Sequence, residues 1–179
     1  MNHATDNLIL PECYIDTNLI EALVPPQHGY NHQKGCPAVA KKMKEKFADS
    51  FALGIMDKDK RRVSYLQEFS LIASDQDLEI YKHKERPHYI LLISPAVEGF
   101  ILKAASTLKL DLRTYEIPVS LEGMKKETKQ VDAKSSQKYR KLFKALSSAP
   151  EFQKLARVIF YLKDKRYEAQ EDVLREMIE

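Results

Sequence analysis

Short apolar runs alternate with segments of helical periodicity along the first two-thirds of the chain. In residues 15–24, and in the segment that begins at Pro37, apolar side chains recur three and four positions apart, as on one face of a helix. Apolar runs of strand length occupy residues 8–10, 51–56, 78–81 and 88–93. Strands that alternate with helices are typical of an α/β fold. We therefore predict a mostly parallel sheet of four or five strands, flanked by helices.

The segments between these runs carry different patterns. Apolar positions in residues 63–73 predict a helix, and Pro95 begins another helix that continues through Ala105. Two prolines at 25 and 26 end the first helix, since proline cannot continue one. Residues 27–35 most resemble a short strand that leaves a loop.

The C-terminal third has a helical character throughout. Residues 124–146 are basic and helical in pattern, and no strong strand signal follows Pro118. Beyond Pro150, apolar residues recur at steps of three and four, a stripe that must pack on another surface. The sequence thus predicts an α/β domain over residues 1–118 and a helical extension over residues 119–179, packed on it as one structural unit.

Composition places the chain among ordinary globular proteins. Its 179 residues include 29 Lys or Arg and 26 Asp or Glu, for a net charge of +3, which alone does not establish nucleic-acid binding. Two cysteines are too few for a disulfide framework and fit a reducing compartment. The start of the chain lacks the pattern of a signal peptide, and no run is long enough for a membrane span. We expect a cytoplasmic protein without a membrane partner.

Acidic residues follow two of the predicted strands. Asp57 and Asp59 come directly after the 51–56 run, and alternate residues of an extended chain point the same way. Both carboxylates can therefore share a hard cation such as Mg²⁺ or Mn²⁺. Glu12 directly follows the first run, at the same edge of a parallel sheet, so three carboxylates converge. The alternatives are a solvated charged turn at 57–60 and a helix-start role for Glu12.

These motifs resemble those of the Toprim domain, which primases, topoisomerases and the OLD nucleases share. Residues 8–17, Leu-Ile-Leu-Pro-Glu-Cys-Tyr-Ile-Asp-Thr, resemble the first motif: an apolar strand, a glutamate, usually a glycine, then an aspartate that opens a helix. Residues 54–59, Gly-Ile-Met-Asp-Lys-Asp, resemble the second motif, a strand that ends in Asp-x-Asp. Ser94-Pro95-Ala96-Val97-Glu98 is similar to the Asn-Pro-x-x-Glu segment of RloB-like Toprim proteins. The resemblance covers residues 7 to about 108.

The resemblance implies a fold, a cofactor and a set of roles. A Toprim-like Rossmannoid sheet is expected, with Asp57 and Asp59 as ligands of Mg²⁺ or Mn²⁺. Glu12 is expected to serve as catalytic acid or base, or as a further metal ligand, and Glu98 is a candidate fourth acid. A bound divalent ion neutralises charge that develops on a phosphate during cleavage or transfer.

Basic residues adjoin the predicted site and suggest a nucleic-acid partner. The candidate contacts are Lys58, Lys60, Arg61, Lys84, Arg86, Lys125, Lys126 and Lys129. Tyr139 and Phe143 lie within the basic helical segment, a composition compatible with a surface that follows phosphates. The alternative interpretation of that segment is a solvated helix face.

Two main functions remain in competition. The leading hypothesis is a Mg²⁺-dependent Toprim-like nuclease, or a related protein that processes phosphodiesters. The alternative is a non-catalytic nucleic-acid-binding or regulatory module on a degenerate Toprim scaffold. The chain has no Walker-type phosphate loop, whereas the OLD nucleases carry an ATPase, so an ATPase or another effector protein is a candidate partner. A third option is an unrelated α/β fold in which the acids meet by accident.

Overall fold

A computed structural model describes residues 6–59 and 63–179 and contains a five-stranded sheet of order β1-β2-β5-β4-β3. The strands are β1 (Ile9–Pro11), β2 (Ala52–Asp57), β3 (Phe69–Ser74), β4 (Leu78–His83) and β5 (His88–Ile93). β1, β2 and β5 are parallel, whereas β4 and β3 are antiparallel to their neighbours. The α/β class is confirmed, but the sheet is mixed and its parallel part is confined to one end.

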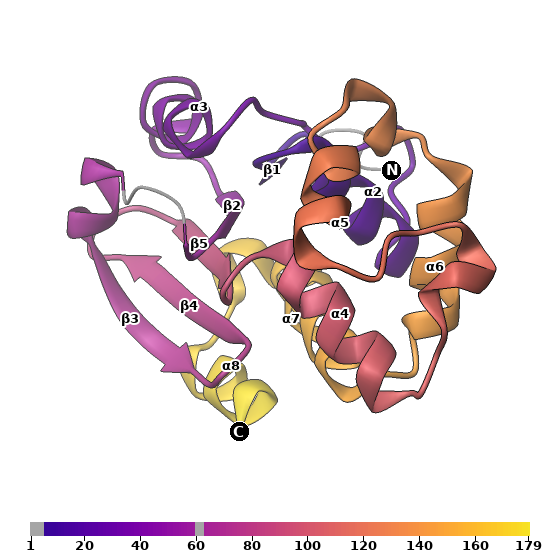
Figure 1. Ribbon diagram of the computed structural model, residues 1–179. Coiled ribbons are helices and arrows are strands. Elements are labelled where there is room, and N and C mark those ends of the chain that lie inside the picture. Colours follow the sequence, from indigo (N-terminus) through magenta and orange to yellow (C-terminus); the bar gives the residue numbers. More distant parts are fainter. Residues whose placement is uncertain (1–5, 60–62) are drawn as a thin grey trace.

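Helices cover both faces of this sheet (Figure 1). The longer helices are α2 (Tyr14–Leu23), α3 (Cys36–Lys42), α4 (Val97–Thr107), α5 (Leu121–Thr128), α6 (Gln137–Leu146), α7 (Pro150–Lys165) and α8 (Glu171–Ile178). The short helical segments are η1 (Met43–Phe47), η2 (Ser64–Glu68), η3 (Leu112–Tyr115), η4 (Val131–Lys134) and η5 (Arg166–Glu168). Leu53 and Ile55 belong to a core shared with α2, α4 and α7, while Ala52 and Met56 belong to a second core with α3 and η1. Successive residues of β2 therefore serve opposite faces.

The close packing of α3 on the sheet depends on Gly54 in the middle of β2. A Cβ atom at this position would lie 2.8 Å from Val39 Cγ1 and 3.0 Å from Met43 Sδ. Both neighbours are fully buried. Glycine therefore lets α3 and η1 approach the strand that carries Asp57.

The predicted helix over residues 63–73 is wrong. Only η2 is helical there, and β3 follows it directly. Tyr65, Leu66, Phe69 and Ile72 have helical spacing and are buried, but β3 pairs with β4 instead. The Asp75 carboxylate accepts backbone N–H bonds from Asp77 and Leu78, both at 2.8 Å. This turn brings β3 and β4 together, so strand pairing prevails over helical periodicity.

Residues 27–35 contain no strand but run beside β1. The backbone N–H groups of Asn31 and Gln33 donate to the carbonyls of Ile9 and Pro11, at 3.0 and 2.9 Å. This segment therefore occupies the free edge of β1 and leads into α3.

The C-terminal helices share one hydrophobic core with the α/β part. The apolar stripe of α7 is fully buried, and the Phe152 ring stacks on Phe100 of α4 with 5.2 Å between ring centroids. The Asn18 side chain of α2 donates to the carbonyls of Ala133 and Ser136, at 2.8 and 3.1 Å. In the part of the chain that the structure describes, no helix has both the length and the apolar character of a membrane span.

Candidate metal centre

Three buried acids meet at the carboxyl ends of β1 and β2. Glu12 directly follows β1, Asp57 is the last residue of β2, and Asp16 lies in the first turn of α2. One carboxylate oxygen from each lies within 4.8 Å of the other two. The side chains are almost completely shielded from solvent. Carboxylates this close repel one another, so a positive charge or a proton among them is stabilising.

The parallel pairing of β1 and β2 places Glu12 beside Asp57. The Glu12 N–H donates to the carbonyl of Ile55 at 2.9 Å, which extends the strand pairing one step beyond β1. The Asp57 N–H then donates to Glu12 Oε2 at 3.0 Å. The first two strands are thus parallel neighbours, which counts against an accidental meeting of these two acids.

Asp57 also holds the start of α4. Its Oδ1 atom accepts a hydrogen bond from the N–H of Val97, the first residue of that helix, at 3.0 Å. A carboxylate is stabilised near a helix N-terminus by the exposed N–H groups and the helix dipole. Asp57 therefore has a structural role besides its place among the acids.

Both cysteines of the chain donate hydrogen bonds to these acids. Cys36 Sγ donates to Glu12 Oε2, and Cys13 Sγ donates to Asp16 Oδ2, each at 2.9 Å. Burial raises the pKa of the Cys13 thiol well above its usual range, and the negative charges of Asp16 and Asp57 raise it further. Cys13 therefore remains a protonated donor at neutral pH.

No motif in the sequence indicates this role of the cysteines. Cys13 is the N-cap residue of α2 and stands three positions before Asp16, the spacing at which side chains meet across a helix start. It occupies the place of the motif's usual glycine, with φ −140°, an extended conformation that any residue adopts. The cysteine thus fits the backbone here without strain.

Asp59 does not belong to the group of three acids found among the described residues, and Asp16 takes its place. β2 ends at Asp57, so the alternation that would align Asp59 with Asp57 stops there. Asp59 lies in the turn, where its N–H donates to the Pro95 carbonyl at 2.8 Å. Its carboxylate is 39% exposed and lies 3.8 Å from Lys125 Nζ.

Asp16 and Glu98 are the remaining acids of the motifs quoted from the sequence. Asp16 is the aspartate of the first motif, which could have identified it as a ligand. Glu98 is buried in the first turn of α4, but its Oε1 accepts a hydrogen bond from Thr128 Oγ1 at 2.5 Å. It therefore connects α4 to α5 and lies outside the group of three.

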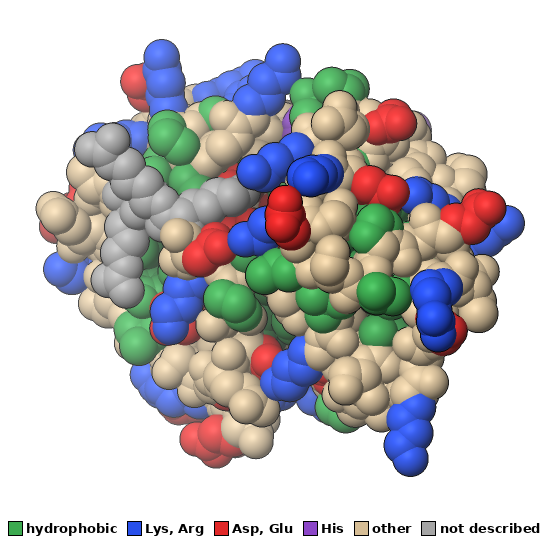
Figure 2. Space-filling view, in the orientation of Figure 1, with side chains coloured by type: hydrophobic (Ala, Val, Ile, Leu, Met, Phe, Trp, Pro, Cys, Tyr) green, Lys and Arg blue, Asp and Glu red, His purple; other side chains and the backbone are tan. Residues whose placement is uncertain are grey.

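Five of the predicted phosphate-binding residues fall into two groups. Lys125 and Lys126 are on α5, with Lys129 at its end. Lys84 and Arg86 lie in the turn between β4 and β5. Figure 2 shows Lys and Arg side chains over α3 and α5, with acidic side chains between them.

Several predicted basic contacts have other partners. Lys58 forms an ion pair with Glu79 at 2.6 Å, and Lys126 forms one with Glu122 at 3.4 Å. Lys60 and Arg61 lie outside the described residues.

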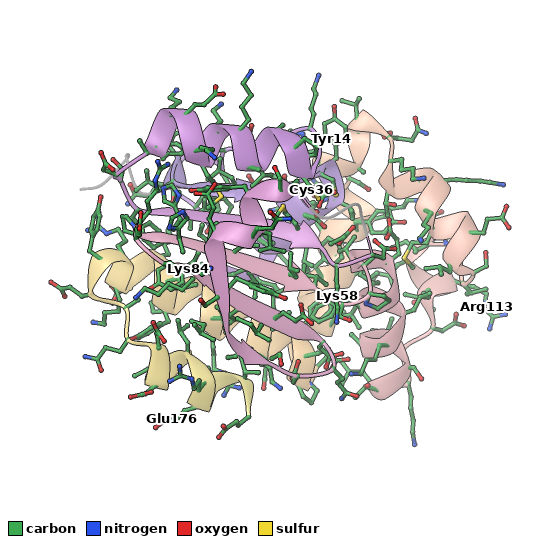
Figure 3. The ribbon with its side chains drawn as sticks, turned by 90° about the vertical axis from the view of Figure 1, so that its left-hand side faces the viewer. Tyr14, Cys36, Lys58, Lys84, Arg113 and Glu176 are labelled. Atoms are coloured by element: carbon green, nitrogen blue, oxygen red, sulfur yellow. The ribbon has the colours of Figure 1, made fainter. Side chains whose placement is uncertain are left out.

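A cleft of about 920 Å³ adjoins Glu12 on the α3 side of the sheet. Glu12 and Cys36 line this cleft, together with other residues of α3, η1 and η2. In Figure 3, Cys36 lies between α3 and the strands of the sheet. Among the three acids, Glu12 is the one that lines this cleft.

Comparison with known proteins gives no match: no family model, no curated protein and no solved structure is similar to this chain. The features that bear on function are the three carboxylates, the thiols and backbone groups that position them, and the cleft beside Glu12. The chemistry of these groups restricts what the site can bind.

Proposed function

We propose that Glu12, Asp16 and Asp57 bind a divalent cation, Mg²⁺ or Mn²⁺, and that the protein is a metal-dependent enzyme that cleaves phosphodiester bonds in nucleic acid. The observation that carries the proposal is the meeting of three buried carboxylates within 4.8 Å. Two oxygens on opposite sides of a Mg²⁺ ion are about 4.2 Å apart, so small side-chain shifts are enough to form the site. All-oxygen ligand sets suit Mg²⁺ and Mn²⁺.

The position of the acids supports the same chemistry. Ligands of open α/β sheets bind at the carboxyl ends of the strands, where Glu12 and Asp57 lie. Both occupy positions that the resemblance to Toprim domains assigns to metal and acid chemistry, whereas Asp16 replaces Asp59. When bound, the cation stabilises negative charge that develops on the phosphate.

Glu12 is suited to move a proton because it alone of the three lines the cleft. In hydrolysis, the oxygen of water bonds to phosphorus as the bond from phosphorus to the leaving oxygen breaks. One proton leaves the attacking water, and solvent water donates another to the leaving oxygen. Glu12 accepts the first of these protons, and Asp16 and Asp57 remain ionised as metal ligands.

A second candidate function is a non-catalytic nucleic-acid-binding module. It is favoured by the structural roles of two acids, since Glu12 accepts the N–H of Asp57 and Asp57 accepts the N–H of Val97. A scaffold that kept these carboxylates only for folding would bind nucleic acid without a divalent cation.

Calorimetric titration with Mn²⁺ and a cleavage assay separate the two candidates. Asp16→Asn preserves size while removing charge, and Asp59→Asn is the matched control outside the group. We expect Asp16→Asn to weaken Mn²⁺ binding at least about tenfold and cleavage of labelled DNA or RNA at least about a hundredfold. Asp59→Asn should behave like the unmodified protein. Equal cleavage by Asp16→Asn would reject the enzyme, and no Mn²⁺ binding by the unmodified protein would reject the metal centre.

A further inference from the structure

The cleft beside Glu12 has basic side chains along one wall. Lys41 on α3 and Lys44 on η1 both line it. Lys41 is exposed, and among the described residues it forms no ion pair. Lys44 forms an ion pair with Glu68 at 2.8 Å, and its Nζ lies 5.3 Å from the centroid of the Tyr65 ring. These two lysines provide positive charge beside Glu12, and Glu45, which also lines the cleft, offsets part of it.

The basic surface continues past the end of the cleft to the turn between β4 and β5. Arg86 Nη1 donates to the carbonyl of Lys44 at 3.2 Å, and Lys84 Nζ donates to the carbonyl of Gln67 at 3.4 Å. Lys44 and Gln67 both line the cleft. In Figure 3, Lys84 lies below the opposite end of the α3–η1 segment from Cys36. The cations thus form a path that leads away from Glu12.

The uncharged part of the lining offers surface for bases. Pro37 and Ala40 of α3, together with Val63 and Tyr65, belong to the lining of the cleft. Single-stranded nucleic acids bind grooves that combine positive charge with aromatic or apolar surface, because their bases are free to leave the stack. A duplex keeps its bases paired inside and presents phosphates and sugars.

We propose that this cleft binds one strand of a polynucleotide as it leaves the metal centre, with phosphates against Lys41, Lys44, Arg86 and Lys84. The apolar lining favours a single strand over a duplex. The extension of the cations beyond the cleft favours a polymer over a mononucleotide. The inference rests on the proposed function, since Glu12 connects the cleft to the reacting phosphate.

The test is fluorescence anisotropy with labelled 12-residue oligonucleotides, performed in EDTA so that metal binding does not contribute. Oligo-dT and oligo-U test DNA and RNA, a duplex of equal length tests strandedness, and dTMP tests a mononucleotide. The variants are Lys41→Gln and the combination Lys41→Gln, Lys84→Gln and Arg86→Gln. Lys109→Gln removes an exposed lysine just after α4 and serves as the matched control.

We expect the triple variant to bind a single strand at least about tenfold more weakly, with Lys41→Gln intermediate and Lys109→Gln unchanged. Removing each cation that binds a phosphate should reduce the dependence of log K on log salt by about 0.7. Equal affinity of the triple variant and the unmodified protein would overturn the inference. Equal affinity for the duplex, or displacement by equimolar dTMP, would also overturn it. Circular dichroism and a thermal melt check that the variants are folded, and Lys41→Gln alone must weaken binding even if the triple variant unfolds.

Failure of this inference differs from failure of the proposed function. If Mn²⁺ binds and depends on Asp16 while the triple variant keeps its oligonucleotide affinity, the cleft is rejected and the metal centre remains. If Mn²⁺ does not bind while the triple variant loses oligonucleotide affinity, the cleft remains as the surface of a non-catalytic module.

Discussion

Two groups of acidic residues lie at the same end of the sheet, on different strands, and have different neighbours. Around the β3–β4 hairpin, Asp75 pairs with Lys154, Asp77 with Lys103 and Glu79 with Lys58. At the ends of β1 and β2, the acids instead approach one another, and backbone N–H groups and thiols position them.

The difference separates acids that stabilise the fold from acids that can bind a cation. A lysine already supplies the positive charge at each hairpin acid and joins it to a helix or strand. A group of mutually close carboxylates creates a strong negative potential, which favours a doubly charged ion.

The largest expected effect is stabilisation by metal at the group of three acids. At Mn²⁺ concentrations about 100 times Kd, the free energy of unfolding should rise by about 2.7 kcal/mol, because the ion binds the folded state. Denaturation in urea with and without Mn²⁺ measures this increase. Asp16→Asn should remove it, whereas Asp77→Asn should retain it. Equal Mn²⁺ stabilisation of these two variants would abolish the distinction between the groups.

The next effect concerns the ion pair of Asp75 and Lys154, which joins the hairpin to α7. Lys154→Met removes the charge but keeps the length of the side chain, and leaves a partly buried carboxylate without its cation. We expect it to lower the free energy of unfolding by about 2 kcal/mol. Urea denaturation measures the change, with Lys165→Met as the control at an exposed pair. A loss no greater than that of the control would contradict the structural role.

A smaller effect is expected from the thiols at the metal centre. Cys36→Ala removes the donor to Glu12, whereas Cys36→Ser replaces it with a hydroxyl donor. Loss of a group that orients a ligand typically weakens metal binding about tenfold, or about 1.4 kcal/mol. We expect this loss for alanine and a smaller one for serine, measured by Mn²⁺ calorimetry. If alanine and serine have the same affinity, the hydrogen bond does not orient Glu12.

The smallest effect is a dependence of stability on pH at Asp75. Burial alone would raise the pKa of Asp75, but the Lys154 ammonium and the N–H groups of Leu78 and Asp77 outweigh it and hold the pKa below its usual value. Asp75 therefore stabilises the protein above the pKa of the unfolded chain. This contribution is lost as pH falls through the lower pKa of the folded state. The stability difference between the unmodified protein and Asp75→Asn should shrink from pH 6 to pH 3 in urea titrations; a constant difference would contradict it.

Part of the fold and of the site was predictable from local pattern. The run at residues 88–93 coincides with β5, and the run at 51–56 lies within one residue of β2. Glu12 and Asp57 could be assigned to one candidate metal site, because parallel strands bring their carboxyl ends to one edge of the sheet. The error at residues 63–73 arose because buried residues of an η2–β3 segment happen to follow helical spacing.

The sequence alone determined where most strands and helices lie, because alternating or 3.6-residue patterns act over neighbouring positions. It also determined that acids would follow two of the strands. Only the tertiary structure decided that Asp16, and not Asp59, completes the group, because that depends on where β2 ends and how α2 begins. Only the tertiary structure decided, likewise, which thiols donate to the acids and where the cleft lies. Cys36 and Glu12 are 24 positions apart, and only the folded chain packs α3 on β2 and brings the two side chains together.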